Sequence, residues 1–112
     1  MADAWEVDLA GEVVVDGSDV YVTVVGEVDL ASGTTLRARL DHVIATTGGT
    51  VVLDLSGVGF IDSSGLRVLV ENGRRLAAMN RSLSVHHPSA PTRRVLRITG
   101  LGPELGVVDG AV

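Results

Sequence analysis

Cysteine and lysine are both absent from this chain of 112 residues. Without cysteine there is no disulfide bond, thiolate metal site or thiol nucleophile, and we expect a cytoplasmic protein that folds without oxidative cross-links. All nine basic residues are arginine, which excludes any mechanism that requires a catalytic lysine.

Aromatic residues and long hydrophobic runs are scarce too. One Trp, one Tyr and one Phe stand against a hydrophobic fraction of 46%, so the core must consist mainly of Val, Leu, Ile and Ala. No apolar run approaches the ~20 residues that a membrane-spanning helix needs. The first residues, MADAWEVDLAGE, lack a basic leader followed by an apolar segment. We therefore expect a chain that is neither exported nor embedded in a membrane.

Charge and length restrict the function classes further. The net charge of −5 offers no basic surface for nucleic acid or for anionic lipid. A chain of this length can bury one core but not two, so we predict a single domain over residues 1–112.

Hydrophobic patterns predict several strands. Two β-branched runs in EVVVDGSDVYVTVVGEVD, which begins at Glu12, flank the turn-forming segment Asp16-Gly17-Ser18-Asp19 and predict a β-hairpin. Before it, Trp5 to Leu9 alternates apolar and acidic residues, so residues 1–11 form either a loosely ordered extension or the first strand. Thr50 to Leu55 is an apolar run broken only by an aspartate, which is typical of a central strand covered on both faces.

Helical spacing alternates with these strands. A first helix carries Leu36, Leu40, Val43 and Ile44, and a second runs from Asp62 to near Asn80. A short strand over Ser82 to His86 follows. The segment Pro88-Ser89-Ala90-Pro91 then introduces a third helix that carries Val95, Leu96 and Ile98, and a last strand lies at Val107-Val108. The order predicts an α/β fold, with a mixed sheet of four to five strands covered by helices and joined by right-handed crossovers.

The segment Asp62-Ser63-Ser64-Gly65 carries the clearest chemical signal. A helix start presents unpaired backbone N–H groups and the positive end of the helix dipole, so a serine there can carry a phosphate without disrupting its own fold. The plainer interpretation is that Asp62 or Ser63 is only an N-cap, worth roughly 1 kcal/mol, and that Gly65 lets a tight turn form.

Three segments together resemble the STAS family of anti-sigma factor antagonists. The first is VVLDLSGVGFIDSSGLRVL, from Val51 to Leu69, in which a buried strand and a short turn lead to Asp-Ser-Ser-Gly-Leu at a helix start. The second, Gly26-Glu27-Val28-Asp29-Leu30-Ala31, is similar to the family's Gly-Glu-Leu-Asp segment. The third runs from Ser89 to Leu101 and is similar to the family's final helix. Two departures are Arg67, where many members carry a small residue, and a slightly longer N-terminal segment.

The resemblance implies a phosphorylation switch rather than an enzyme. Ser63 would be the phosphoacceptor, Ser64 its neighbour, and Asp29 would lie beside it, with Asp62 and Gly65 completing the partner-binding surface. The implied partners are an anti-sigma factor with serine kinase activity, which uses Mg-ATP, and a serine phosphatase. The resemblance implies no cofactor and no metal held by this chain. Asp29 can also act as the N-cap of the first helix, and Glu27 is expected to face solvent.

Two other functions remain open. One is a STAS adaptor subunit of a transport or stress-sensing complex, although such relatives often lack the Asp-Ser-Ser-Gly sequence. The other is a small serine hydrolase using Ser63 with His86 or His87, which lacks the Gly-x-Ser-x-Gly elbow and an identifiable base.

The remaining candidate sites are weak. Adjacent histidines at a strand end point to opposite faces, so His86 and His87 do not suggest a metal site. Gly57-Val58-Gly59 lacks the spacing and lysine of a nucleotide-binding loop. Arg93, Arg94 and Arg97 predict only a solvated basic face on the third helix.

Overall fold

A computed structural model describes residues 2–108 of the chain. Its elements are β1 (Asp3–Glu6), β2 (Leu9–Asp16), β3 (Asp19–Val28), α1 (Leu30–Thr46), β4 (Val51–Ile61), α2 (Ser63–Ala78), β5 (Leu83–His86), α3 (Ala90–Thr99), the 3₁₀-helix η1 (Pro103–Leu105) and β6 (Val107–Val108). The predicted hairpin is confirmed: β2 and β3 pair antiparallel from Asp16↔Asp19 onward, around a turn at Gly17 with φ of 65°.

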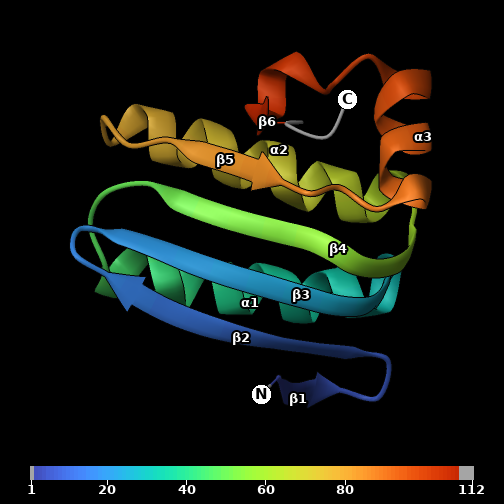
Figure 1. Cartoon of the computed structure of the whole chain (residues 1–112), viewed down its shortest axis with the longest axis horizontal. Coiled ribbons are helices and arrows are strands. Elements are labelled where there is room, and N and C mark those ends of the chain that lie inside the picture. Colours follow the sequence, from blue (N-terminus) through green and yellow to red (C-terminus); the bar gives the residue numbers. More distant parts are fainter. Residues whose placement is uncertain (1, 109–112) are drawn as a thin grey trace.

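The six strands form one mixed sheet in the order β1-β2-β3-β4-β5-β6 (Figure 1). The pairs β1·β2 and β2·β3 are antiparallel, and the pairs from β3 to β6 are parallel. The α/β class is therefore confirmed, but the sheet has six strands rather than four or five. The first is the separate edge strand β1, which the alternation from Trp5 could not distinguish from an extension of β2.

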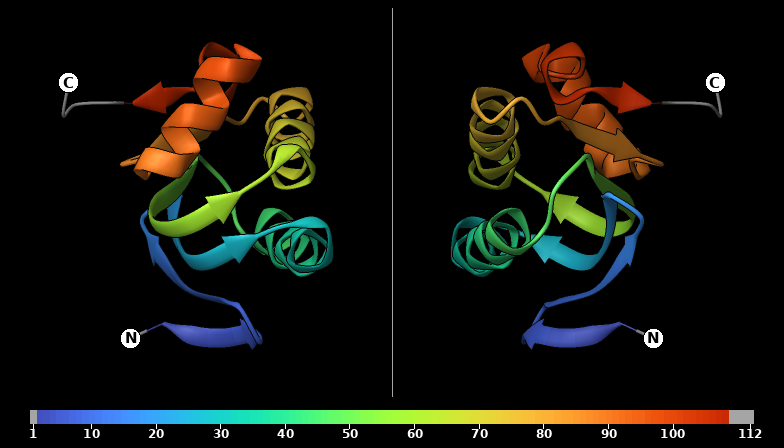
Figure 2. Two further views of the ribbon diagram at one scale, coloured as in Figure 1. Left: turned by 90° about the vertical axis from the view of Figure 1, so that its right-hand side faces the viewer. Right: turned by 90° about the vertical axis from the view of Figure 1, so that its left-hand side faces the viewer.

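Helices α1 and α2 lie side by side on one face of the sheet, and α3 lies on the other side (Figure 2). The core lies between the sheet and the α1–α2 pair and is aliphatic, as the composition predicts. Its fully buried members include Val20, Val22, Leu53 and Leu55 from the sheet and Leu36, Leu40, Leu66, Leu69 and Leu76 from the two helices. Burial of this apolar area supplies the main stabilisation.

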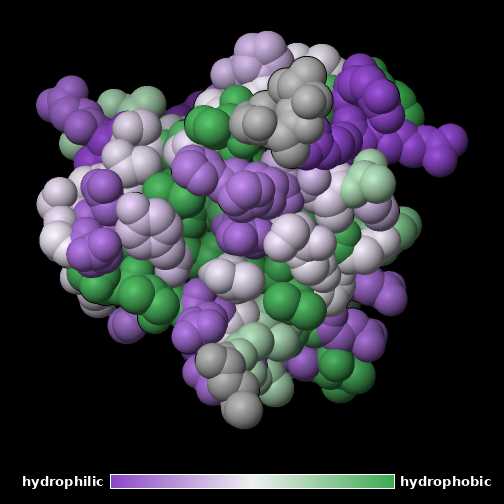
Figure 3. Space-filling model, in the orientation of Figure 1, coloured by the Kyte–Doolittle hydropathy of each residue, from purple (hydrophilic) through white to green (hydrophobic). Residues whose placement is uncertain are grey.

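The opposite face of the sheet is only partly covered. Val14 and Tyr21 pair across β2 and β3 there and remain 49% and 42% exposed. Seen from this side, hydrophobic residues lie in separate groups among hydrophilic ones (Figure 3). In residues 2–108, no helix combines the length and apolar character needed to cross a membrane.

Two local expectations need correction, and one element was not expected. The segment from Ser56 to Ile61 is not a turn, because β4 continues through it to Ile61 with irregular pairing to β3 after Thr23. Ile98 does not belong to the buried stripe of α3, since it is 77% exposed. The 3₁₀-helix at Pro103–Leu105 was not predicted, because three residues are too short for a periodic signal.

Candidate functional site

The candidate site lies where β3 and β4 end. Val28 and Ile61 are paired as the last residues of these parallel neighbours, and the Asp62 N–H donates to the Val28 carbonyl oxygen at 3.2 Å. Asp29 and Asp62 each follow their strand directly, and each caps the helix that comes next. The parallel pairing therefore brings together two helix starts that lie 33 residues apart in the sequence.

Asp62 caps α2 with its side chain. Its Oδ1 accepts hydrogen bonds from the backbone N–H of Ser64 at 2.9 Å and of Gly65 at 3.1 Å, from an extended backbone with φ of −109°. Two N–H groups that would otherwise lack a partner are thereby satisfied. The N-cap is therefore Asp62 and not Ser63, which becomes the first residue of the helix.

Ser63 is exposed, and its hydroxyl is unused. Within residues 2–108 its side chain makes no hydrogen bond, whereas the next serine, Ser64, is half-buried in a groove between α1 and α2. Leu30, Gly33, Thr34, Arg37, Arg67 and Val68 line the same groove. Neither serine hydroxyl has a hydrogen bond within residues 2–108, so the two differ in exposure: Ser63 is exposed and Ser64 is half-buried.

Asp29 caps α1 through a capping box with Ser32. Its Oδ1 accepts from the Ser32 N–H at 2.9 Å, and the Asp29 N–H donates to the Ser32 Oγ at 2.9 Å. The Ser32 hydroxyl also lies within hydrogen-bonding distance of the Glu27 carbonyl oxygen, at 2.7 Å, and of Asp29 Oδ1, at 3.0 Å. These bonds, led by that from the Ser32 N–H, hold the pKa of the Asp29 carboxyl below its usual value. Asp29 is therefore ionised near neutral pH and contributes a negative charge to the site.

Gly65 is required by packing rather than by a turn. It is the third residue of α2 and is buried, and its φ is not positive. A Cβ at this position would lie 2.5 Å from Val28 Cγ1, 2.9 Å from the Val28 carbonyl oxygen and 3.0 Å from Ile61 Cγ1. The glycine thus lets the start of α2 rest directly on the ends of β3 and β4.

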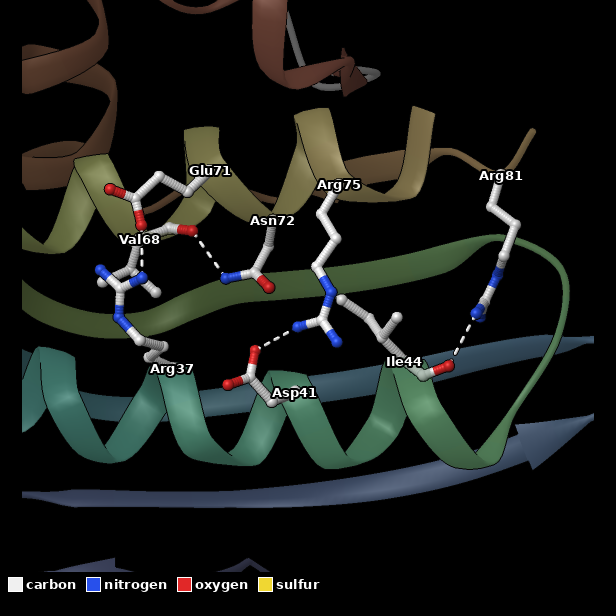
Figure 4. Close-up of polar contacts among 8 residues, drawn as sticks. All are labelled: Arg37, Asp41, Ile44, Val68, Glu71, Asn72, Arg75 and Arg81. Atoms are coloured by element: carbon white, nitrogen blue, oxygen red, sulfur yellow. Dashed lines mark hydrogen bonds and ion pairs between the residues drawn. The ribbon is translucent and has the colours of Figure 1, made fainter. Parts of the chain in front are cut away.

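Polar contacts fix α1 and α2 relative to each other (Figure 4). Arg37 pairs with Glu71, and Arg75 Nη1 lies 2.5 Å from Asp41 Oδ1. The buried Asn72 bonds within α2 instead, since its Nδ2 donates to the Val68 carbonyl oxygen at 2.8 Å. The ion pairs are half-exposed and each is worth little, but together they help to keep the two helices in register.

Arg81 binds the end of α1, a role that the sequence did not suggest. Its guanidinium donates to the carbonyl oxygens of Ile44 at 2.8 Å and Gly49 at 2.9 Å and to Thr47 Oγ1 at 3.1 Å. Carbonyls at a helix end lack helical partners, so this side chain satisfies groups that would otherwise be unpaired. An isolated arginine after a helix carries no sequence signal for such a contact.

Two exposed apolar side chains flank the site and were also missed. Leu30, directly after Asp29, is 76% exposed, and Phe60, two residues before Asp62, is 45% exposed. The predicted solvent-facing position of Glu27 is confirmed. Single exposed apolar side chains are common on protein surfaces, so Leu30 and Phe60 do not by themselves define an interface.

The histidines are not brought to Ser63. His86 pairs in register with Asp54, from which β4 continues to Ile61 before Ser63 begins the helix. The ring of His86 instead lies 3.0 Å from the Ser84 Oγ. Among residues 2–108 there is no cluster of three or more side chains able to hold a metal ion.

The fold and the two capped helix starts define a STAS-type domain. The family model described as "Mlab, STAS domain" matches residues 12–107, and the chain belongs to this family.

Several similar proteins are named as anti-sigma factor antagonists. The anti-sigma F factor antagonist of Lysinibacillus sphaericus is 32% identical over 85 residues, which cover 75% of this chain and 73% of the relative. An anti-sigma factor antagonist from Mycobacterium paratuberculosis superposes with a TM-score of 0.81 at 25% identity, over 96% of this chain and 89% of its own. The anti-sigma factor antagonist SpoIIAA, in its unphosphorylated form, superposes with a TM-score of 0.76 at 25% identity, over 91% and 89%.

Proposed function

We propose that this chain is a bacterial, cytoplasmic anti-sigma factor antagonist controlled by phosphorylation of Ser63. The unmodified form binds an anti-sigma factor and so releases a sigma factor. The observation that carries the proposal is the exposed Ser63 at the start of α2, whose hydroxyl makes no hydrogen bond within residues 2–108. The strand before it ends paired with the end of β3, which the ionised Asp29 follows directly. The names of the relatives support the choice of partner.

The chain acts in this cycle as a substrate and a binding partner. The anti-sigma factor, acting as a serine kinase, transfers the γ-phosphoryl group of Mg-ATP to the Ser63 Oγ, and ADP leaves while the hydroxyl proton passes to a base of the kinase. A serine phosphatase uses water to break the new O–P bond, which restores the hydroxyl and releases inorganic phosphate. No cofactor is held by this chain at any step.

Phosphorylation breaks the complex by local charge. A phosphoserine adds about −1.5 to −2 charges at neutral pH, next to the carboxylates of Asp29 and Asp62. A phosphate for which the partner supplies no cation costs roughly 3–5 kcal/mol when it is buried in the interface, which corresponds to a loss of about two to four orders of magnitude in affinity. The positive end of the α2 dipole favours the phosphate within the fold itself, so the domain stays folded.

The test begins with capture of the partner and its identification by mass spectrometry. Calorimetry then compares its affinity for unmodified, Ser63-phosphorylated and Ser63→Ala protein, with Ser64→Ala as the matched control. We expect Ser63→Ala and Ser64→Ala to bind like the native chain, and phosphoprotein to bind at least a hundredfold more weakly. Backbone chemical shifts should change around the starts of α1 and α2 only.

Three results would contradict the proposal. Binding that is insensitive to phosphorylation would indicate a constitutive STAS adaptor. Ester hydrolysis that is abolished by Ser63→Ala would indicate the hydrolase alternative. Chemical-shift changes that spread through β1 and β2 would indicate a global rearrangement of the domain instead of local repulsion.

A further inference from the structure

Most arginines of this protein already have a partner within the fold. Arg37, Arg74 and Arg75 form ion pairs, Arg81 binds the end of α1, Arg93 donates to the Pro88 carbonyl oxygen, and Arg39 lies over the Trp5 ring at 5.5 Å. Within residues 2–108, only Arg67, Arg94 and Arg97 have no hydrogen bond, ion pair or ring contact. Their charges are not used to hold the fold together.

Arg67 is the member of this group that lies nearest Ser63. It follows Ser63 by four residues on α2, and residues at this spacing are neighbours on the surface of a helix. Both side chains line one surface hollow, together with Leu66, Val70, Glu71 and Arg74. Arg67 also lines the groove between α1 and α2 that holds Ser64. Its exposed guanidinium can therefore turn toward the first residue of the helix.

The other charges around this hollow are engaged elsewhere. Glu71, four residues beyond Arg67, pairs with Arg37 of α1 (Figure 4), and Arg74 pairs with Glu104. The carboxylate of Asp62 accepts two backbone hydrogen bonds, and that of Asp29 is held by Ser32. Among the charged groups of residues 2–108 that line this hollow, Arg67 is the cation left for a new anion at Ser63.

We propose that Arg67 is the internal counter-ion of phosphorylated Ser63, and that phosphorylation orders this otherwise free side chain across the first turn of α2. The inference rests on the proposed phosphorylation of Ser63. A guanidinium can donate two parallel hydrogen bonds to phosphate oxygens. The acid also precedes the base by four residues, which is the more favourable orientation on a helix. Arg67 is thus a positioning residue for the phosphate, in addition to the capped helix start.

The test installs phosphoserine at position 63 during translation, so that no kinase is needed and the kinase part of the proposed function can fail separately. Phosphorus NMR then measures the second pKa of the phosphate, normally about 6, in the native, Arg67→Gln and Arg94→Gln backgrounds. Arg94→Gln removes the same charge from an unpartnered arginine on α3, so it controls for net charge. Nitrogen NMR of the arginine Nε groups reports whether the Arg67 side chain becomes ordered.

We expect the phosphate pKa to be lower in the native background than in Arg67→Gln by roughly 0.2 to 0.4, the equivalent of one exposed charge pair at this spacing. Arg94→Gln should leave it unchanged, and 1 M salt should remove most of the difference. The Arg67 Nε signal should shift on phosphorylation, while unmodified Arg67→Gln melts like the native chain. Equal pKa values in the native and Arg67→Gln proteins would overturn the proposal, as would equal shifts from both variants.

Discussion

Replacing Gly65 by alanine tests how closely α2 rests on the sheet. The added methyl would lie 2.5 Å from Val28 Cγ1, where carbon atoms ordinarily approach to 3.5–4.0 Å, and 2.9 Å from the Val28 carbonyl oxygen. Because Val28 is paired within the sheet, it cannot move aside without disturbing the β3·β4 pairing. Either the start of α2 lifts from the strand ends, or the Val28 side chain leaves its rotamer.

Two opposing contributions determine how much Gly65→Ala changes the free energy of unfolding. Overpacking of this kind costs about 1–3 kcal/mol, while replacing a helical glycine by alanine gains up to about 1 kcal/mol. Gly73→Ala in the same helix is the matched control, because a methyl there would lie 3.5 Å from Leu83 Cδ2, an ordinary contact. Both variants gain the same helix propensity, so this gain cancels when their stabilities are compared. The control should therefore be the more stable of the two by about 1–3 kcal/mol.

Urea unfolding followed by circular dichroism measures this difference directly. Gly65→Val should be more destabilising than Gly65→Ala, and both should be more destabilising than Arg67→Ala, which removes an exposed side chain without a partner in residues 2–108. If Gly65→Ala unfolds at the same or a higher urea concentration than Gly73→Ala, the close approach of α2 to Val28 is wrong.

Two further predictions concern the helix ends. Arg81→Ala should lower the free energy of unfolding by about 1–3 kcal/mol in urea titrations, because it leaves partly buried carbonyl groups at the end of α1 without their donor. Arg74→Ala breaks an exposed ion pair and should cost less than about 1 kcal/mol, so equal losses would refute the role of Arg81. Asp29 has a lowered pKa, so its charge stabilises the fold above the unfolded pKa of about 3.9, and this contribution is lost as pH falls through the lower folded pKa. Melting temperatures of native and Asp29→Asn protein should differ near pH 7 and converge in acid; a constant gap would contradict the assignment.

Local signals in the sequence were sufficient for the three helices and the hairpin, but not for β1, the end of β4 or η1. The choice of Ser63 as phosphoacceptor came from the family resemblance. Asp16-Gly17-Ser18-Asp19 between two β-branched runs predicts the hairpin, because its turn geometry depends on adjacent residues only. The cap at Asp62 also depends on adjacent residues only. Its carboxylate accepts hydrogen bonds from the N–H groups two and three residues further along the chain. The prediction that Ser63 stands at the N-terminal end of the second helix is confirmed for the same reason.

Only the tertiary structure decided how these parts meet. Asp29 and Asp62 follow neighbouring strand ends because β3 and β4 pair in parallel up to Val28↔Ile61, a register that no local pattern encodes. The need for glycine at position 65 comes from Val28, 37 residues earlier in the chain, and not from a turn. The charge of Arg67 remains free because Glu71 is paired with Arg37 across two helices. Short-range propensity fixes what each segment forms, whereas contacts between distant segments fix which side chains share a site.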